Sequence, residues 1–139
     1  MSISLEIPGT PAPWTAQMRN AERSLSFQRM QAWQEQIRAH ARQKMGRRAP
    51  TAGAVRLDVV FYLPTPGRAP TGAEKRRQWQ RQHILRPPDL DNMRKAFSDA
   101  LQGIVYLDDG QVVAGETVKT YIDEPEGLTV AWVLTEEYM

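Results

Sequence analysis

The chain has 139 residues, a formal net charge of +2 and no cysteine. Its length fits one domain with a real hydrophobic core, and the lack of cysteine excludes a disulfide framework and a thiolate metal site. No apolar run is long enough to span a membrane, and the first residues lack the pattern of a secretory signal. We therefore expect one cytoplasmic domain over residues 1–139.

Charge is distributed unevenly along the chain. Residues 1–95 hold 17 Lys or Arg against 7 Asp or Glu, whereas residues 96–139 hold one lysine and nine acidic residues. This asymmetry predicts a polyanionic partner for the basic part. The alternative is a surface on which the two signs mix, because separation in sequence need not be separation in space.

The first half of the chain predicts a strand, a helix and a second strand. Apolar residues alternate over 3–7 and again over 55–63, which is typical of strands. Between them, a stripe at helical spacing predicts a helix over 27–44. The segment before this helix contains Arg19, Asn20 and Arg23, which would reach a phosphate or merely line a loop. The helical stripe consists of Met30, Trp33, Ile37 and Ala41.

The end of the chain predicts further strands. Apolar residues favour a strand over 111–122 and another over 128–134, with a turn between them. A second main helix, which begins near Asp91, precedes these strands. The pattern as a whole predicts an α+β fold, with a mixed or antiparallel sheet of about four to five strands and two main helices.

Residues 67–86 form a basic insertion. A short helix is compatible with residues 73–82, and Trp79 lies among the cations. A basic segment with an aromatic residue predicts a substrate-binding arm, in which cations contact phosphates and the ring stacks on an unpaired base or wedges at a junction. The alternative is a mobile, solvated insertion. The candidate phosphate contacts are Lys75, Arg76, Arg77, Arg81 and Arg86.

An acidic stretch follows the insertion. Asp89 and Asp91 come after a rigid Pro-Pro pair, and Asp91 is suited to be the N-cap of a helix whose apolar face begins at Met93. Lys95 lies one helical turn after Asp91 and therefore on the same side. The start of this helix thus brings two carboxylates and one ammonium together.

A second acidic pair, Asp108 and Asp109, comes shortly after this helix. Hard cations such as Mg²⁺ or Mn²⁺ take oxygen ligands and keep several waters, so two or three aspartates are enough to hold one. Such an ion polarises a phosphate and lowers the pKa of a bound water, and a lysine offsets charge in the transition state. Carboxylates from two adjacent elements, together with Lys95, predict a metal-dependent phosphodiesterase.

Each of these residues also has a structural interpretation. Asp91 would be only an N-cap, Asp-Asp-Gly only a hairpin turn, and Lys95 only the partner of a carboxylate on a solvated face. Their combination, in this order, favours a site.

The order of these residues resembles the RusA-type Holliday-junction resolvases. The resemblance is carried by Asp-Leu-Asp-Asn-x-x-Lys-Ala, then Asp-Ala-Leu, then Asp-Asp-x-Gln, and it is tight over residues 88–113. The residues concerned are Asp89, Leu90, Asp91, Asn92, Lys95, Ala96, Asp99, Ala100, Leu101, Asp108, Asp109 and Gln111.

The resemblance implies a small homodimeric, Mg²⁺-dependent endonuclease of bacteria and their prophages, which resolves four-way DNA junctions by paired nicks in DNA recombination and repair. Carried over by position, Asp89, Asp91 and Asp109 would be the essential carboxylates and metal ligands, and Lys95 the essential lysine. Asp108 is the alternative to Asp109. The basic insertion has no counterpart in the family. A less selective nuclease, and a non-catalytic phage accessory protein that binds branched DNA, are the other functions compatible with the sequence.

Overall fold

The structure is a computed structural model that describes residues 1–13, 25–86 and 88–139. Arg19, Asn20 and Arg23, the possible phosphate contacts near the N-terminus, lie outside the described residues. No helix within the described ranges is long and apolar enough to cross a membrane. The elements in chain order are β1 (Ser2–Pro8), α1 (Leu25–Met45), β2 (Val55–Pro64), α2 (Ala73–His83), α3 (Leu90–Leu101), the 3₁₀ turn η2 (Asp109–Gln111), β3 (Val112–Ala114), β4 (Thr117–Ile122), β5 (Leu128–Thr135) and the 3₁₀ turn η3 (Glu136–Tyr138).

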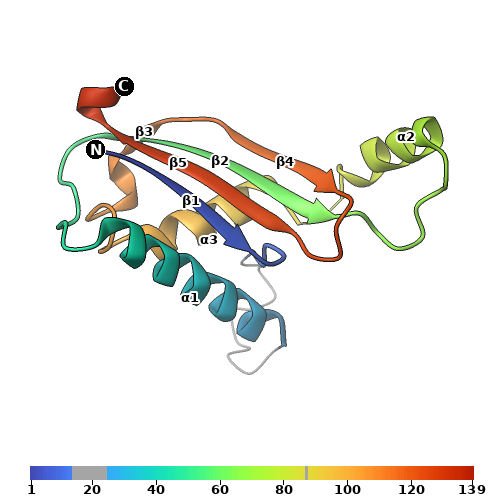
Figure 1. The fold of residues 1–139 in the computed structure, drawn as a ribbon, viewed down its shortest axis with the longest axis horizontal. Coiled ribbons are helices and arrows are strands. Elements are labelled where there is room, and N and C mark those ends of the chain that lie inside the picture. Colours follow the sequence, from blue (N-terminus) through green and yellow to red (C-terminus); the bar gives the residue numbers. More distant parts are fainter. Residues whose placement is uncertain (14–24, 87) are drawn as a thin grey trace.

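The five strands form one mixed sheet, which confirms the predicted α+β class (Figure 1). β5 lies between β1 and β2 and is antiparallel to both. On its other side β2 pairs in parallel with β3 and then with β4. Because β2 and β4 run in parallel, the chain must cross over between them, and that crossover carries α2 and α3.

The hydrophobic core lies between the sheet and the two helices α1 and α3, which cover the same face (Figure 1). Alternate residues of β1, β2 and β5 point into it. In β1 and β2 these are the apolar residues of the predicted alternation. In β5 the buried residues are Thr129, Ala131, Val133 and Thr135, so the alternating apolar residues of 128–134 lie on the opposite face. At its centre Trp33 of α1, Phe61 of β2 and Phe97 of α3 meet with ring centroids 6.0–6.3 Å apart. These contacts fix α3, and with it the acidic stretch, against the sheet.

The predicted strand over 111–122 is wrong in its extent, because the structure contains two short strands there. Gly115 separates them and has a φ of +130°, a backbone conformation that residues other than glycine rarely adopt. A Cβ atom at Gly115 would lie 1.8 Å from the carbonyl oxygen of Leu57. The backbone of β2 thus passes so close that the neighbouring strand is interrupted at this residue.

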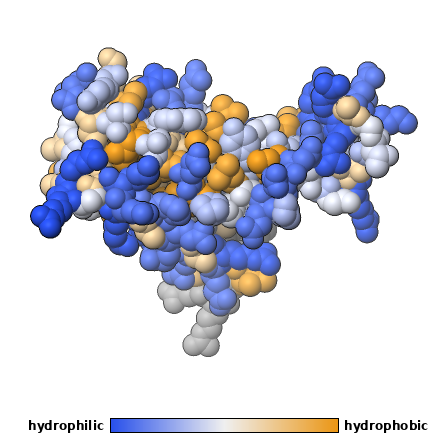
Figure 2. Space-filling view, in the orientation of Figure 1, coloured by the Kyte–Doolittle hydropathy of each residue, from blue (hydrophilic) through white to orange (hydrophobic). Residues whose placement is uncertain are grey.

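The third helix, α2, extends beyond the end of the sheet (Figure 1). It buries none of its residues, and in Figure 2 it is almost entirely hydrophilic, whereas hydrophobic residues gather over the strands. The sequence predicted two main helices, and the two that cover the core, α1 and α3, agree with that prediction. α2 matches the short helix expected over 73–82 and is one residue longer.

Candidate active site

Asp89 occupies the N-cap of α3, and Asp91 lies in the first turn. The prediction that Asp91 caps the helix is therefore wrong. The chain is extended at Asp89, with φ −70° and ψ 139°, and its carbonyl oxygen already accepts the N–H of Met93 at 3.1 Å. The helix therefore starts at Leu90, two residues earlier than expected. The Asp89 side chain makes no capping hydrogen bond, so its exposed carboxylate remains available to a ligand.

The segment that leads into Asp89 is held by a lysine that sequence reasoning missed. The Nζ atom of Lys119, on β4, donates hydrogen bonds to the carbonyl oxygens of Arg86 and Pro88, both at 3.0 Å. Lys119 is the one Lys or Arg in residues 96–139. Its position among acidic residues was the only feature of the sequence that set it apart. Its contacts tie the entrance of α3 to the sheet and set the position of Asp89.

One face of α3 carries alternating charge. Asp91, Lys95 and Asp99 follow at intervals of four residues, which places them along one side of the helix. Asp91 and Lys95 are exposed, and Asp99 is half-buried and accepts a hydrogen bond from Nε2 of Gln102 at 3.1 Å. The predicted pairing of Asp91 and Lys95 on one side of the first turns agrees with this arrangement.

Asp108 and Asp109 do not form a hairpin turn, and that structural interpretation is wrong. Asp108 is the N-cap of η2, and its carboxylate accepts the N–H of Gly110 at 2.7 Å. Its own N–H donates to Oε1 of Gln111 at 2.9 Å, which completes a capping box. The Asp108 carboxylate is therefore engaged in a hydrogen bond within the turn. Asp109 is the first residue of the turn and is exposed.

Two further residues hold this acidic turn in place. Nε2 of Gln111 donates to the carbonyl oxygens of Thr51 and Gly53, both at 2.8 Å. The hydroxyl of Tyr106 donates to the backbone oxygen of Ser98 at 2.7 Å and also contacts its Oγ at 2.8 Å. Burial raises the pKa of Tyr106 to about 12, so this buried hydroxyl keeps its proton. The turn is thereby fixed to the C-terminal half of α3.

Asp109 lies among other carboxylates. Its pKa is raised, first by the interaction with the Asp108 side chain, then by partial burial and by the charge of Asp99. Asp99 is eight residues from Asp91, which corresponds to roughly 12 Å along a helix. The structure therefore brings Asp109 to Asp99 and Asp108, at the opposite end of α3 from Asp89 and Asp91.

Residues 1–13, 25–86 and 88–139 contain no group of three or more His, Asp or Glu side chains that could hold a metal ion. Three protein carboxylates around one ion are therefore not assembled within this part of a single chain. Asp89 and Asp91 nevertheless offer exposed oxygen donors in one helical turn. Mg²⁺ commonly binds through one or two carboxylates and completes its shell with water and substrate phosphate. The two aspartates fit an ion of that kind.

The basic helix α2 is attached to the sheet through Arg76. Its guanidinium binds the carboxylate of Asp123, with Nη2 at 2.7 Å and Nε at 3.1 Å. Next to it, Nε2 of Gln80 donates to Oγ1 of Thr65 at 3.1 Å. On the same helix Trp79 stacks on His83 with ring centroids 3.9 Å apart. The other predicted phosphate contacts are exposed: Lys75, Arg77, Arg81 and Arg86.

The segments that carry these residues all lie within a match to a known protein family. The family described as Endodeoxyribonuclease RusA matches residues 8–131, which include the start of α3, the acidic turn and the basic helix. The chain is also similar to the uncharacterized protein YqaN of Bacillus subtilis (strain 168), with 38% identity over 76 residues. That match covers 52% of this chain and 53% of YqaN, so the chain spans about half the length of that relative.

Proposed function

The chain belongs to the RusA endodeoxyribonuclease family, and on this premise we propose that it is an endodeoxyribonuclease that cuts branched DNA. Its substrate is the four-way Holliday junction, which it resolves in DNA recombination and repair. The observation that carries the proposal is the pair of exposed carboxylates, Asp89 and Asp91, at the start of α3. This end of a helix carries a partial positive charge that favours phosphate.

The cofactor proposed for this site is Mg²⁺, with Mn²⁺ as a substitute, held by Asp89 and Asp91. When bound, such an ion polarises the scissile phosphate and lowers the pKa of the attacking water. Lys95 lies one turn from Asp91, where its ammonium offsets negative charge on the phosphate in the transition state. Asp109 is the third carboxylate in this proposal, as the family pattern implies, and it lies with Asp99 and Asp108 at the other end of α3 from Asp89 and Asp91.

The basic helix supplies the contacts with the DNA backbone in this proposal. Lys75, Arg77, Arg81 and Arg86 are exposed and lie in or just after α2, close in sequence to Asp89. Contacts between cations and phosphates position a duplex without reading its sequence. Arg76 is better suited to holding α2 in place, because its guanidinium already binds Asp123.

A homodimer is the proposed working species. A four-way junction has two strands to cut at symmetric points, which matches the two-fold symmetry of a dimer. The face of the sheet opposite α1 and α3 offers an apolar surface, with Trp132 43% and Val118 44% exposed. Other outward residues of this face are Val60, Tyr62, Leu128 and Val130. A second copy covering this surface would shield it from water.

Among the described residues, no three carboxylates are placed so that they could hold one metal ion, and this favours a second candidate function. In that case the chain binds branched DNA as a phage accessory protein, without cutting it or with less selectivity. An assay with a labelled four-way junction and a matching linear duplex separates the two. The proposed resolvase nicks the junction in paired positions with Mg²⁺, leaves the duplex intact and loses nicking with a chelator. Binding to the junction without nicking by the wild type would support the accessory protein.

The dimer is tested separately from the chemistry. Light scattering should give about twice the 15.8 kDa mass of the chain. Mixing wild type with Asp91→Asn protein should yield heterodimers that nick a junction once and seldom resolve it. A monomer both free and on DNA would contradict the dimer and leave a nuclease that makes single nicks.

A further inference from the structure

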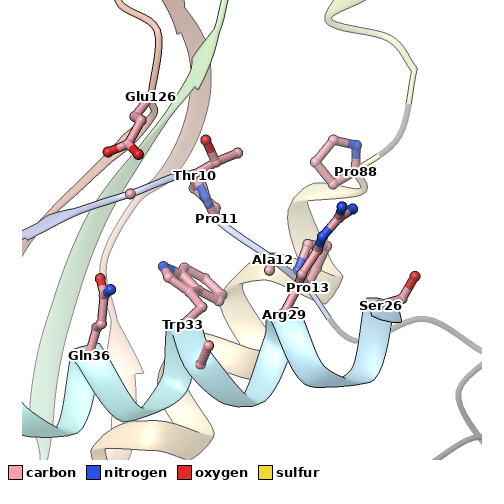
Figure 3. Close-up of a pocket in the computed structure, with 12 residues that line it drawn as sticks. Thr10, Pro11, Ala12, Pro13, Ser26, Arg29, Trp33, Gln36, Pro88 and Glu126 are labelled. Atoms are coloured by element: carbon pink, nitrogen blue, oxygen red, sulfur yellow. The ribbon is translucent and has the colours of Figure 1, made fainter. Parts of the chain in front are cut away.

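A cavity of about 580 Å³ lies beside the entrance of α3 (Figure 3). One wall is the loop after β1, with Pro11, Ala12 and Pro13, and the other is the first half of α1. Pro88, the residue before Asp89, closes one side. Its volume lies within the range of about 300–1,000 Å³ that is usual for ligand sites. The cavity is therefore large enough for a ligand and directly adjoins the proposed active site.

A buried hydrogen-bond donor faces this cavity. Trp33 is 4% exposed, and its Nε1 atom has no hydrogen-bond partner among the described residues. In Figure 3 the nitrogen edge of its ring lies at the cavity, toward the loop that contains Pro11. A buried N–H without a partner destabilises the folded protein, and a ligand that supplied an acceptor would remove this loss. Gln36, one turn further along α1, adds an amide that both donates and accepts.

The lining identifies the chemical class of the ligand. Proline, alanine and tryptophan side chains provide apolar surfaces for a flat ring, while Trp33 and Gln36 provide polar atoms for its edge. The two charged residues of the lining, Arg29 and Glu126, have opposite signs, so the cavity as a whole does not favour an anion. A phosphate alone is therefore a poor match. A nucleobase is a good one, because it has flat apolar faces and an edge of donors and acceptors.

We propose that this cavity binds an unpaired nucleobase of the DNA strand at the active site. Because Pro88 belongs to the cavity and Asp89 follows it directly, a base held there would place its own backbone next to the carboxylates at the start of α3. Arg29 is exposed at the cavity and can contact the flanking phosphate. This inference rests on the proposed function and adds that a branched substrate is recognised by a base that has left the duplex.

The indole N–H of Trp33 reports directly on this proposal. The chain has four tryptophans, so ¹⁵N-labelled protein gives four indole signals, and Trp33→Phe identifies the one from Trp33. With a chelator present, a short single-stranded DNA should shift that signal. An oligonucleotide of the same length made of abasic sites should leave it in place. Equal shifts with both probes, or a shift with neither, would overturn the proposal.

A second variant keeps the test independent of the folding of Trp33→Phe. Gln36 is exposed on α1, and Gln36→Ala should weaken binding of the single-stranded DNA by roughly three- to tenfold. Gln31→Ala, on the same helix but outside the cavity lining, is the matched control and should bind as the wild type does. Equal affinity of Gln36→Ala and wild type would also count against the base site.

Failure of this inference is distinguishable from failure of the proposed function. If the protein nicks a four-way junction but the Trp33 signal shows no base-dependent shift, only the base site is rejected. A base-dependent shift of the Trp33 signal in a protein that never nicks DNA would reject the nuclease and leave a DNA-binding cavity.

Discussion

The guanidinium of Arg76 binds the carboxylate of Asp123 through two nitrogens, at 2.7 Å and 3.1 Å. It thereby joins the first half of α2 to the segment between β4 and β5. The same carboxylate accepts a hydrogen bond from the hydroxyl of Thr65 at 2.9 Å. Because α2 buries none of its residues, such polar contacts determine where the basic helix lies.

Arg76→Ala and Asp123→Asn should therefore have the same effect on α2. Either change removes the ion pair, so amide hydrogens of residues 73–83 should exchange faster while those of the core do not. If Arg76 instead contacts DNA phosphate, only Arg76→Ala would weaken DNA binding.

We expect Arg77→Ala with Arg81→Ala to reduce the slope of log K against log salt by about two, since each phosphate contact contributes about 0.9. An unchanged slope would show that α2 does not touch the backbone.

The attachment of α2 should also depend on pH. The hydrogen bonds from Arg76, and then from Thr65, lower the pKa of Asp123. A lowered pKa means that the stabilising contact is fully present above the ordinary carboxyl pKa of about 3.9 and is lost as the pH falls through the lowered value. The protection of residues 73–83, measured as the exchange rate relative to the intrinsic rate at each pH, should fall in that acidic range in the wild type. In Asp123→Asn this protection should be low already at neutral pH.

Asp89→Asn and Asp91→Asn should each abolish nicking while junction binding is retained or slightly tightened. Both changes remove a metal ligand, and both reduce negative charge beside the bound phosphates. Asp108→Asn is the matched control, because its carboxylate already accepts the N–H of Gly110 within the turn. Nicking with Mg²⁺ and binding in a chelator measure the two properties. Full nicking by either Asp89→Asn or Asp91→Asn would contradict the proposed metal ligands.

Lys95→Ala should lower the rate of nicking by roughly 10²-fold or more, with little change in the Kd for the junction. The reason is that its ammonium acts on charge that develops in the transition state rather than on bound substrate. Single-turnover nicking and equilibrium binding separate the two effects. A lowered Tm, with proportionate loss of binding and nicking, would indicate instead that Lys95 is only structural.

Asp109→Asn should abolish nicking yet raise the Tm at neutral pH. The neighbouring carboxylates, first Asp108 and also Asp99, raise the pKa of Asp109 in the folded protein. A raised carboxyl pKa means that folding is opposed when the group ionises, so stability falls as the pH rises from the ordinary value through the raised one. Removing the charge should remove this loss, and the gain in Tm over wild type should vanish at acidic pH. A lower Tm at neutral pH would contradict the repulsion.

Gly115→Ala should be strongly destabilising. A Cβ at this position would meet the backbone oxygen and carbon of Leu57 at 1.8 Å and 2.5 Å, so β2 and β4 would have to separate. Gly103→Ala is a suitable control, since Gly103 has a positive φ of 81° but open space around the new atom. We expect about 1 kcal/mol for Gly103→Ala, and several kcal/mol for Gly115→Ala. Urea denaturation measures both, and equal losses would contradict the steric explanation.

Sequence periodicity alone determined most of the fold. Alternation over 3–7 and 55–63 identified β1 and β2, because each of these strands has one apolar face in the core. The stripe from Met30 to Ala41 identified α1 in the same way. Alternation over 128–134 also identified β5, although its apolar residues lie on the face of the sheet away from the core. The pattern failed over 111–122, where the close approach of Gly115 to Leu57 interrupts the strand. A contact with a residue so distant in the chain leaves no trace in local hydropathy.

The candidate site was only partly determined by sequence. Spacing placed Asp91, Lys95 and Asp99 on one side of a helix, because the helical repeat is set by backbone geometry. Only the tertiary structure decided that Asp109 lies beside Asp99, because Tyr106 and Gln111 attach its turn through hydrogen bonds to Ser98, Thr51 and Gly53. Likewise, the ion pair of Arg76 with Asp123 joins residues 47 positions apart. Charge in the sequence identified Asp109 and Arg76 as candidate site residues, but the partners of these side chains depend on packing between distant segments.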